Sequence, residues 1–289
     1  MTSLYLPRPQ RRLSLRLGVT IALLAAFAWA LSGLEISFAE LLRLPRRLAV
    51  LAGLMFPPDA AYGRERVLAA IVESIQIAWV GTLMGAAFSF PLGLLAARNL
   101  SSYGGAVVKF LLASIRAFPE ILLAILFVPI VGLGAFAGTL AVGLHSVGTL
   151  GKLTSEVVES IDSSPIEAVT ASGGGRLEVF RYAVLPQVMP DVVAYWLYRF
   201  EINLRASAVL GIVGAGGVGG VLFNTLIYRR YAKAGAVIVL TVLVVLAIDT
   251  LSASVRRRIV SGDSGGSLIS RLSGYAGRYA ALLASRRGR

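Results

Sequence analysis

Three charged side chains stand within seven positions in one of the most apolar parts of the chain: Arg199, Glu201 and Arg205. Such a group could be a catalytic constellation, or a set of charges that holds the helices of a membrane protein together. Residues four apart on a helix are neighbours, so we expect Glu201 and Arg205 to form a structural ion pair that neutralises both charges inside a membrane. Arg199 then needs a partner from another segment, and Glu120 and Glu73 are the candidates.

A glycine-rich run, GAGGVG at 214–219, follows these charges and satisfies the pattern G-x-G-x-x-G. A dinucleotide site also requires a strand before the glycines, a helix after them and an acidic residue about 20 positions further on. Here an apolar segment typical of a membrane helix precedes the run, and the next acidic residue is Asp249, inside another apolar segment. We therefore expect the glycines to form a tight re-entrant turn where a helix leaves the membrane.

Other patterns that could carry chemistry are incomplete. The stretch GTLGKLTS at 148–155 lacks the glycine that a phosphate-binding loop needs five positions before its Gly-Lys pair, because position 146 is Ser. His145 is the only histidine and the chain has no Cys, so we expect a polar packing contact there rather than a transition-metal site. The sequence predicts no catalytic residue, metal or cofactor on this chain.

The composition is that of a membrane protein. Of 289 residues, 56% are hydrophobic and only 15% are charged, and the mean hydropathy is +0.77, whereas roughly a quarter of the residues of a soluble domain are charged. The net charge is +13, and many of the basic residues lie at the two ends of the chain, outside the apolar segments. This distribution favours the orientation of a membrane protein over nucleic-acid binding. The N-terminal apolar stretch has features of a signal peptide, but we expect an uncleaved first span.

Six apolar stretches have the length of membrane helices, at about 17–34, 68–97, 108–131, 135–157, 188–211 and 234–255. The third is interrupted by the sequence RAFPE. With basic residues at both ends, an even number of spans places both termini in the cytoplasm. Residues 35–66 would then lie outside although they contain five arginines, and we expect part of this segment to be an amphipathic helix on the membrane surface.

The segment between the fourth and fifth spans, 158–187, mixes polar and apolar residues. We expect two short helices there, broken around Gly173–Gly175 and stopped at Pro186. Ser163 or Ser164, before Pro165, is expected to start the first of them, with Glu167 in its first turn. On the predicted topology, this segment is a structured cytoplasmic element that exposes one face.

The spacing in this segment resembles the cytoplasmic loop of ABC importer permeases, E-A-A-x3-G-x9-I-x-L-P. The matching residues are Glu167, Ala168, Gly173, Leu185 and Pro186. Val169 replaces the third small residue of the pattern and Ala183 replaces its Ile, both apolar for apolar. In that family the loop forms a coupling helix that docks in a cleft of the ATPase subunit. The resemblance therefore implies an ATPase-coupling role for the matching residues.

A longer resemblance, over about 65–258, is to phosphonate ABC transporter permeases. Their fifth span runs R-F-E-I-N-x-R-A-S-A-V-L-G, and the same letters stand at 199–211, while SIRAFPEILLAILFV at 114–128 is similar to their third span. The resemblance implies an all-α fold: a polytopic membrane helix bundle of about six transmembrane helices, the type I ABC importer permease fold, in the bacterial inner membrane. The predicted parts are an N-terminal helix with its connecting segment at 1–64, a permease core at 65–258 with the coupling loop at 159–187, and a basic tail at 259–289.

The implied function is that of the permease subunit of an ATP-driven importer for phosphonate or a related phosphorus oxyanion. The implied partners are a second copy of the chain in a homodimer, two ATPase subunits that carry the ATP and Mg, an extracytoplasmic substrate-binding protein and membrane lipid. A cationic or hydroxyl-bearing path lowers the barrier to an anionic cargo, and the candidates are Arg116, Asn203, Arg205 and Ser207. Three alternatives stay open: the same machine for phosphite, phosphate or methionine, an ATP-independent secondary transporter or channel, and a scaffold that only recruits a partner.

Overall fold

The structure, a computed structural model, describes residues 10–33, 38–99 and 104–261. The described residues form helices and connections, with no strand among them. The chain divides into two compact units, Met1–Leu54 and Met55–Arg289. The predicted basic tail falls almost entirely outside the described residues.

Two helices make up the described part of the first unit, α1 (Gln10–Ser32) and α2 (Phe38–Met55). The side chains described on α1 are all exposed, although most of them are apolar, and this is the pattern of a helix whose neighbour is lipid. The prediction of a helix within 35–66 is confirmed by α2. Its place on a membrane surface stays a prediction.

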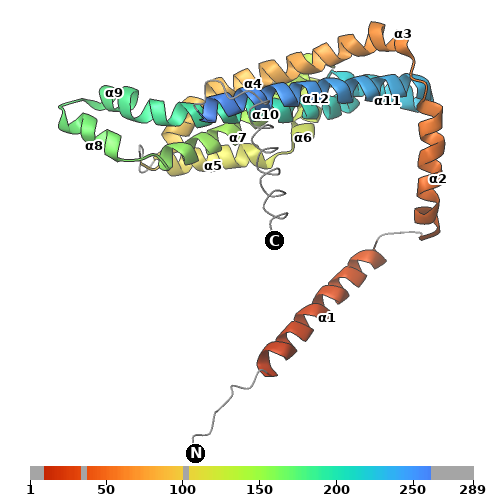
Figure 1. The fold of residues 1–289 in the computed structure, drawn as a ribbon, viewed down its shortest axis with the longest axis horizontal. Coiled ribbons are helices and arrows are strands. Elements are labelled where there is room, and N and C mark those ends of the chain that lie inside the picture. Colours follow the sequence, from red (N-terminus) through yellow and green to blue (C-terminus); the bar gives the residue numbers. More distant parts are fainter. Residues whose placement is uncertain (1–9, 34–37, 100–103, 262–289) are drawn as a thin grey trace, which may run out of the picture. The chain divides into compact units, whose positions relative to one another are not determined.

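The second unit is a bundle of helices, with α8 and α9 at one end and α3 and α11 at the other (Figure 1). In chain order the elements are α3 (Ala60–Tyr62), the π-helix η1 (Gly63–Val67), α4 (Leu68–Ala96), α5 (Gly104–Ala117), α6 (Glu120–Val131), α7 (Ala135–Glu159), α8 (Ser164–Ala171), α9 (Arg176–Glu178), the π-helix η2 (Val179–Val184), α10 (Leu185–Leu210), the 3-10 turn η3 (Gly211–Val213), α11 (Val218–Ile227) and α12 (Tyr231–Ser261).

Small residues hold α4 and α7 together at the centre of this unit. A methyl group added at Gly81 would lie 2.7 Å from a Val142 methyl, and one added at Gly93 would lie 2.6 Å from Thr154 Cβ. These glycines let the two backbones approach closely, which is how membrane helices gain packing energy where burial from water contributes little. The result is a rigid pair of helices against which α10 packs.

Each of the six predicted spans is mainly helical over its described residues, and the third is interrupted at Phe118 and Pro119. By length and apolarity, two described helices can cross a membrane, Ala60–Ala96 and Tyr231–Ile259. Two bent pairs bring that number to four when each pair counts as one span: α5 with α6, bent by 83°, and the helix ending at Val213 with α11, bent by 45°. The break predicted from RAFPE is therefore confirmed.

One predicted boundary is wrong. The helix before Pro186 does not stop there, because α9, η2 and α10 run on from one another from Arg176 to Leu210. Pro186 lies in the first turn of α10, where its missing N–H and fixed φ are tolerated. From Arg176 onward, the segment that matches the loop pattern therefore continues into the fifth span as one uninterrupted helix, with no break at Pro186.

Candidate functional site

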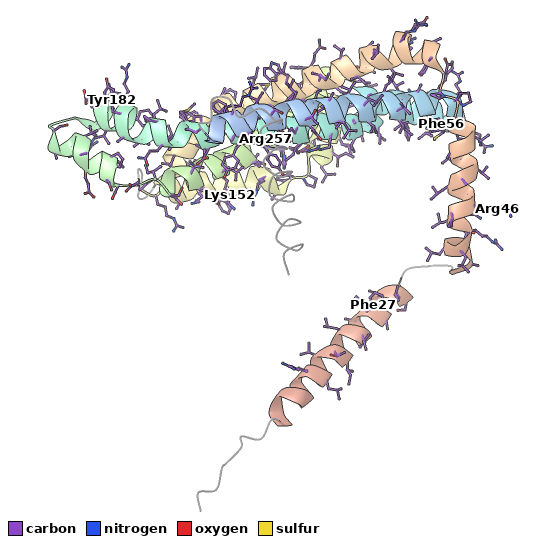
Figure 2. All side chains as sticks on the ribbon, in the orientation of Figure 1. Phe27, Arg46, Phe56, Lys152, Tyr182 and Arg257 are labelled. Atoms are coloured by element: carbon purple, nitrogen blue, oxygen red, sulfur yellow. The ribbon has the colours of Figure 1, made fainter. Side chains whose placement is uncertain are left out.

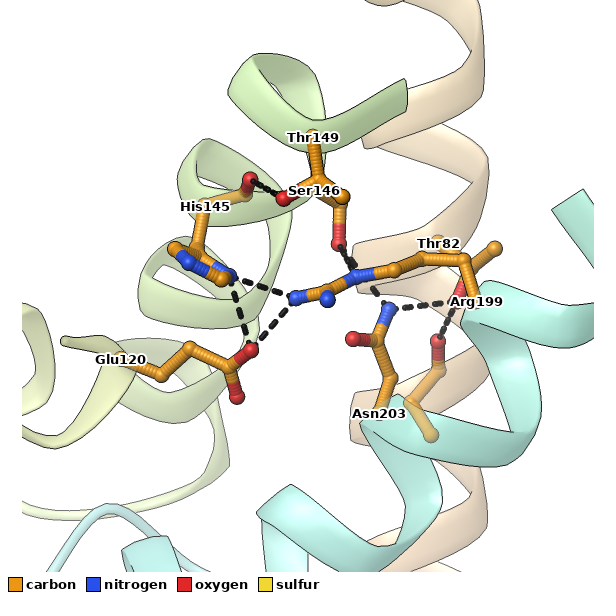
Figure 3. Close-up of polar contacts among 8 residues, drawn as sticks. Thr82, Glu120, His145, Ser146, Thr149, Arg199 and Asn203 are labelled. Carbon is orange, nitrogen blue, oxygen red and sulfur yellow. Dashed lines mark hydrogen bonds and ion pairs between the residues drawn. The ribbon is translucent and has the colours of Figure 1, made fainter. Parts of the chain in front are cut away.

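A buried polar cluster centred on Arg199 joins α6, α7 and α10 (Figure 3). Arg199 Nη2 donates to Glu120 Oε1 at 2.5 Å, and Arg199 Nε donates to Ser146 Oγ at 3.0 Å. His145 Nδ1 lies 2.8 Å from the same Glu120 oxygen and 2.6 Å from Arg199 Nη2. Of the two predicted partners of Arg199, Glu120 is thus confirmed. The polar contact predicted for His145 is confirmed as well.

The break between α5 and α6 places Glu120 in this cluster. Pro119 is the N-cap of α6, and Glu120 is its first residue. A residue before a proline is disfavoured in the helical conformation, so α5 ends at Ala117 and the chain turns. Glu120 then stands at the N-terminal, positive end of the dipole of a new helix and beside the Arg199 guanidinium.

Asn203, one helical turn beyond Arg199, extends the polar cluster to α4. Its Nδ2 atom donates to Thr82 Oγ1 at 2.8 Å and to Ser146 Oγ at 3.0 Å. Asn203 and Ser207 are fully buried within the unit, and the Ser207 hydroxyl donates to the carbonyl of Leu204. These two path candidates therefore lie in the interior of the chain.

The predicted ion pair between Glu201 and Arg205 is wrong. Arg205 Nη1 lies 2.7 Å from Asp249 Oδ2, and Glu201 Oε1 lies 3.4 Å from Arg256 Nη1, both partners being on α12. The i,i+4 rule describes an isolated helix, whereas here α12 packs beside α10 and offers the opposite charge to each residue. The two ion pairs therefore join α10 to α12, and Glu201 and Arg205 do not neutralise each other along α10.

The remaining path candidates, Arg205 and Arg116, are exposed. The Arg205 side chain is 49% exposed and that of its partner Asp249 is 29% exposed, and Asp249 stands within the apolar run of α12. Arg116 lies in the last turn of α5. The four path candidates thus separate into two exposed arginines and two buried polar residues.

The loop that resembles a coupling helix is fixed at its beginning by Asp162. Asp162 Oδ1 accepts hydrogen bonds from the backbone N–H of Ser164 at 3.0 Å and from its hydroxyl at 2.9 Å. The Ser164 backbone N–H, with the hydroxyl, lowers the pKa of the Asp162 carboxyl below its usual value. The predicted helix start at Ser163 or Ser164 is confirmed, because Ser163 is the N-cap residue and α8 begins at Ser164. The Ser163 side chain makes no cap hydrogen bond, and Asp162 accepts the bond from the Ser164 N–H.

Gln187 ties this loop to the fifth span. Its side-chain oxygen accepts from the Asp162 N–H at 3.0 Å, and its Nε2 donates to the carbonyl of Ala183 at 2.7 Å. Ile166 on α8 packs against a buried cluster that includes Val184 and Val188. Side-chain hydrogen bonds and apolar packing thus join the loop to the start of α10.

The opposite face of the loop is exposed. Glu167 and Ala168 on α8 are both open to solvent, and Leu177 and Tyr182 are 73% and 64% exposed. Tyr182 projects at the same end of the bundle as α8 (Figure 2). The exposed surface at this end of the bundle therefore combines apolar side chains with the charged side chain of Glu167.

Three residues of the loop pattern lie at its turn and at its end. Gly173 forms the turn between α8 and α9, and Leu185 and Pro186 are the first two residues of α10. Gly173 has φ +87°, a conformation that side chains other than Gly rarely adopt, and the predicted break around it is confirmed. Leu185 is half-buried and Pro186 exposed, at the start of α10. The matching residues thus lie on the first helix of the loop, at its central turn and at the start of α10.

The glycine run forms the predicted tight turn. Gly214, Gly216 and Gly217 all have positive φ, and the Val218 N–H donates to Ser74 Oγ at 2.9 Å. A helix precedes the run, and the described residues contain no strand that a dinucleotide-binding fold would need. The turn therefore joins α10 to α11 and anchors α11 to α4.

Comparisons with known proteins identify the family. Residues 89–261 match the family described as "binding-protein-dependent transport system inner membrane component". The chain is 41% identical over 208 residues to the phosphate-import permease protein PhnE of Mycolicibacterium smegmatis, covering 71% of this chain and 39% of that protein. It is 37% identical over 212 residues to the phosphite transport system permease protein PtxC of Stutzerimonas stutzeri, covering 73% and 77%.

Solved structures agree on the fold. The methionine ABC transporter MetNI, in inward-facing conformations, matches with TM-score 0.58 at 23% identity over 68% of this chain and 98% of that chain. A bacterial ABC transporter that imports the acidic polysaccharide alginate matches with TM-score 0.59 at 15% identity over 86% and 99%. The all-α type I ABC importer permease fold is thus confirmed. The chain belongs to the family of inner membrane components of binding-protein-dependent transport systems.

Proposed function

We propose that this permease subunit imports phosphonate or a related phosphorus oxyanion. The observation that carries the proposal is the pattern of identities. Relatives named for phosphate, phosphite or phosphonate transport are 35–42% identical, whereas a D-methionine permease of Vibrio cholerae is 24% identical. All three compounds present tetrahedral phosphorus with anionic oxygens, so one path chemistry accommodates them.

In this proposal two ATPase subunits dock on the exposed surface of α8 and α9, and they carry the ATP and Mg. Glu167, Ala168 and Gly173 form the docking segment, and Leu185 and Pro186 connect it to α10. The anchoring of Asp162 by Gln187 supports this role, because a docking element must be rigidly joined to the span it moves. ATP binding draws the two loops together and switches the spans between inward-open and outward-open states.

A homodimer is supported by the charges that the isolated chain exposes along its spans. A charge within the membrane faces the interior of a bundle or a water-filled cavity, because contact with lipid is costly. The Arg205–Asp249 pair is only partly covered in the single chain. We place a second copy, or the aqueous path between the copies, against this face.

The path itself contains Arg205 and Arg116, whose guanidinium groups attract an anionic cargo. The partial neutralisation of Arg205 by Asp249 keeps that attraction weak enough for release. Asn203 and Ser207 act behind this surface by setting the position of α10. A substrate-binding protein outside the membrane provides the high affinity and delivers the cargo.

The orientation follows from the docking role. The end of the bundle that carries α8 then faces the cytoplasm, where ATP is available. The basic residues near both ends of the chain support a cytoplasmic position for both termini. This arrangement fits a multi-pass protein of the bacterial inner membrane.

Uptake by cells tests the proposal. The chain is expressed with ATPase and binding-protein subunits from the same source in cells that lack their own importers for phosphorus compounds. We expect uptake of radiolabelled phosphate, phosphite or methylphosphonate, and loss of that uptake when the ATPase is inactivated. Uptake of methionine alone would contradict the cargo, and uptake that continues with an inactive ATPase would contradict the mechanism.

A further inference from the structure

The helix α2 has a charged arc and an apolar arc. At 3.6 residues per turn, Glu40 and the arginines at 43, 46 and 47 share an arc of about 120°, and the rest of the helix surface is mainly Leu, Ala and Met. The apolar side chains project from α2 into open space: Leu42 is 83% exposed and Leu48 is 59% exposed. This is the composition of a helix that lies in a membrane interface.

The charged arc carries two arginines without an internal counter-charge. Arg47 makes a two-pronged ion pair with Glu40, with N–O distances of 2.8 and 3.1 Å. Arg43 and Arg46 are exposed, and within the described part of the chain neither has an acidic partner within 4 Å. A shallow hollow is lined by these three arginines and Val50, and Figure 2 shows the Arg46 side chain extending from α2.

The hollow and the apolar arc together fit one kind of partner. A guanidinium group presents parallel N–H donors that match two oxygens of a phosphate group. In a membrane interface, the phosphates of lipid headgroups lie at the level of the charged arc while the apolar arc contacts acyl chains. A zwitterionic headgroup brings its own cation, so uncompensated arginines select an anionic lipid. A soluble acidic partner would leave the apolar arc in water.

We propose that α2 is an interfacial helix that binds the phosphate group of an anionic phospholipid through Arg43 and Arg46. The Glu40–Arg47 pair limits the strength of this contact by neutralising the third arginine. The helix thereby attaches the segment between the first span and the bundle to lipid of a particular charge.

The test uses the whole chain in nanodiscs of phosphatidylcholine with increasing phosphatidylglycerol. Because the chain has no Cys, Leu48→Cys places a single fluorophore on the apolar arc, and Val50→Cys places one beside the arginines. Quenching by nitroxide groups on the acyl chains reports insertion. We expect quenching at Leu48→Cys to increase with the phosphatidylglycerol fraction, and the label at Val50→Cys to remain accessible to an aqueous quencher.

Variants with altered charge then test whether Arg43 and Arg46 bind the lipid. In the Leu48→Cys background, Arg43→Gln with Arg46→Gln should raise the phosphatidylglycerol fraction at half-maximal quenching about fivefold, because basic residues near an anionic surface each add to its attraction. Glu40→Gln frees Arg47 and should lower that fraction, so the effect is testable in both directions.

A control for net charge is Arg64→Gln with Arg66→Gln, two exposed arginines outside α2, which should leave the titration unchanged. Each of the following results would overturn the proposal. Quenching with the native charges could be independent of phosphatidylglycerol, the titration of the Arg43 and Arg46 variant or of Glu40→Gln could be unchanged, or the control could shift equally. A further such result is a change in quenching on adding inorganic phosphate to pure phosphatidylcholine discs. That result would assign the arginines to a free oxyanion instead.

Discussion

Replacing Glu120 by Gln should destabilise the bundle strongly, because it leaves the Arg199 charge buried without a counter-charge. The Arg199 side chain is only 6% exposed and that of Glu120 only 16% exposed, so solvent screens the pair little. Breaking a buried pair by removing one partner costs about 3–5 kcal/mol. Because the amide of Gln still offers an oxygen acceptor, we expect a loss near the lower end, about 3 kcal/mol, or roughly a hundredfold in the unfolding equilibrium constant.

A matched control is available on the surface of α7. Lys152 and Glu156 form an i,i+4 ion pair at 3.4 Å with side chains 31% and 48% exposed, and such pairs contribute about 0.3–0.5 kcal/mol. Glu156→Gln should therefore have little effect. Replacing both buried partners, Glu120→Leu with Arg199→Met, should recover much of the stability lost in Glu120→Gln, since no unpaired charge remains.

The assay is reversible unfolding of the whole chain in mixed micelles by increasing denaturing detergent, followed by the fluorescence of its three tryptophans. The free energies of the four proteins are compared at one detergent composition. The reasoning is refuted when Glu120→Gln and Glu156→Gln lose the same stability within about 0.5 kcal/mol, because double-mutant cycles in membrane proteins resolve interactions of about that size.

Three further predictions concern the loop and the path. Gly173→Ala should weaken coupling of ATP hydrolysis to transport, because a left-handed residue other than Gly costs about 1–2 kcal/mol; Gly173→Asn, which tolerates that conformation, should retain more coupling, and equal losses would contradict this. Asp162→Ala should speed amide hydrogen exchange at Ser164. The lowered pKa of Asp162 makes its contribution present above the ordinary Asp pKa and lost as pH falls through the folded-state value, so the difference from wild type should vanish in acid. Arg205→Ala should abolish uptake while the complex with the ATPase still assembles, whereas Asp249→Asn should slow release of an anionic cargo; normal uptake by Arg205→Ala would remove that residue from the path.

The fold was predictable because the length of each apolar stretch indicates a membrane helix. The predicted spans are helical, and the breaks at RAFPE and at Gly173 were visible from proline and glycine. The helix end predicted at Pro186 was wrong because a proline is tolerated in the first turn of a helix. The sequence alone does not show at which residue α10 begins.

The polar contacts were less predictable, since they depend on which helices become neighbours. Glu120 was one of two candidate partners for Arg199, and the choice between them is made by the packing of α6. Ser146 stands 53 residues before Arg199, and its small hydroxyl gave no separate indication of a contact. The pairing of Arg205 with Asp249 overrides a local spacing rule for the same reason.

Reconstituted transport tests the central claim most directly. The chain, its ATPase partner and a binding protein are assembled in proteoliposomes, and entry of radiolabelled phosphite or methylphosphonate is measured with and without ATP. The account predicts that ATP drives accumulation, and that the loaded binding protein stimulates ATP hydrolysis. Cargo entry that is equal with and without ATP, or hydrolysis that does not respond to the loaded binding protein, would contradict it.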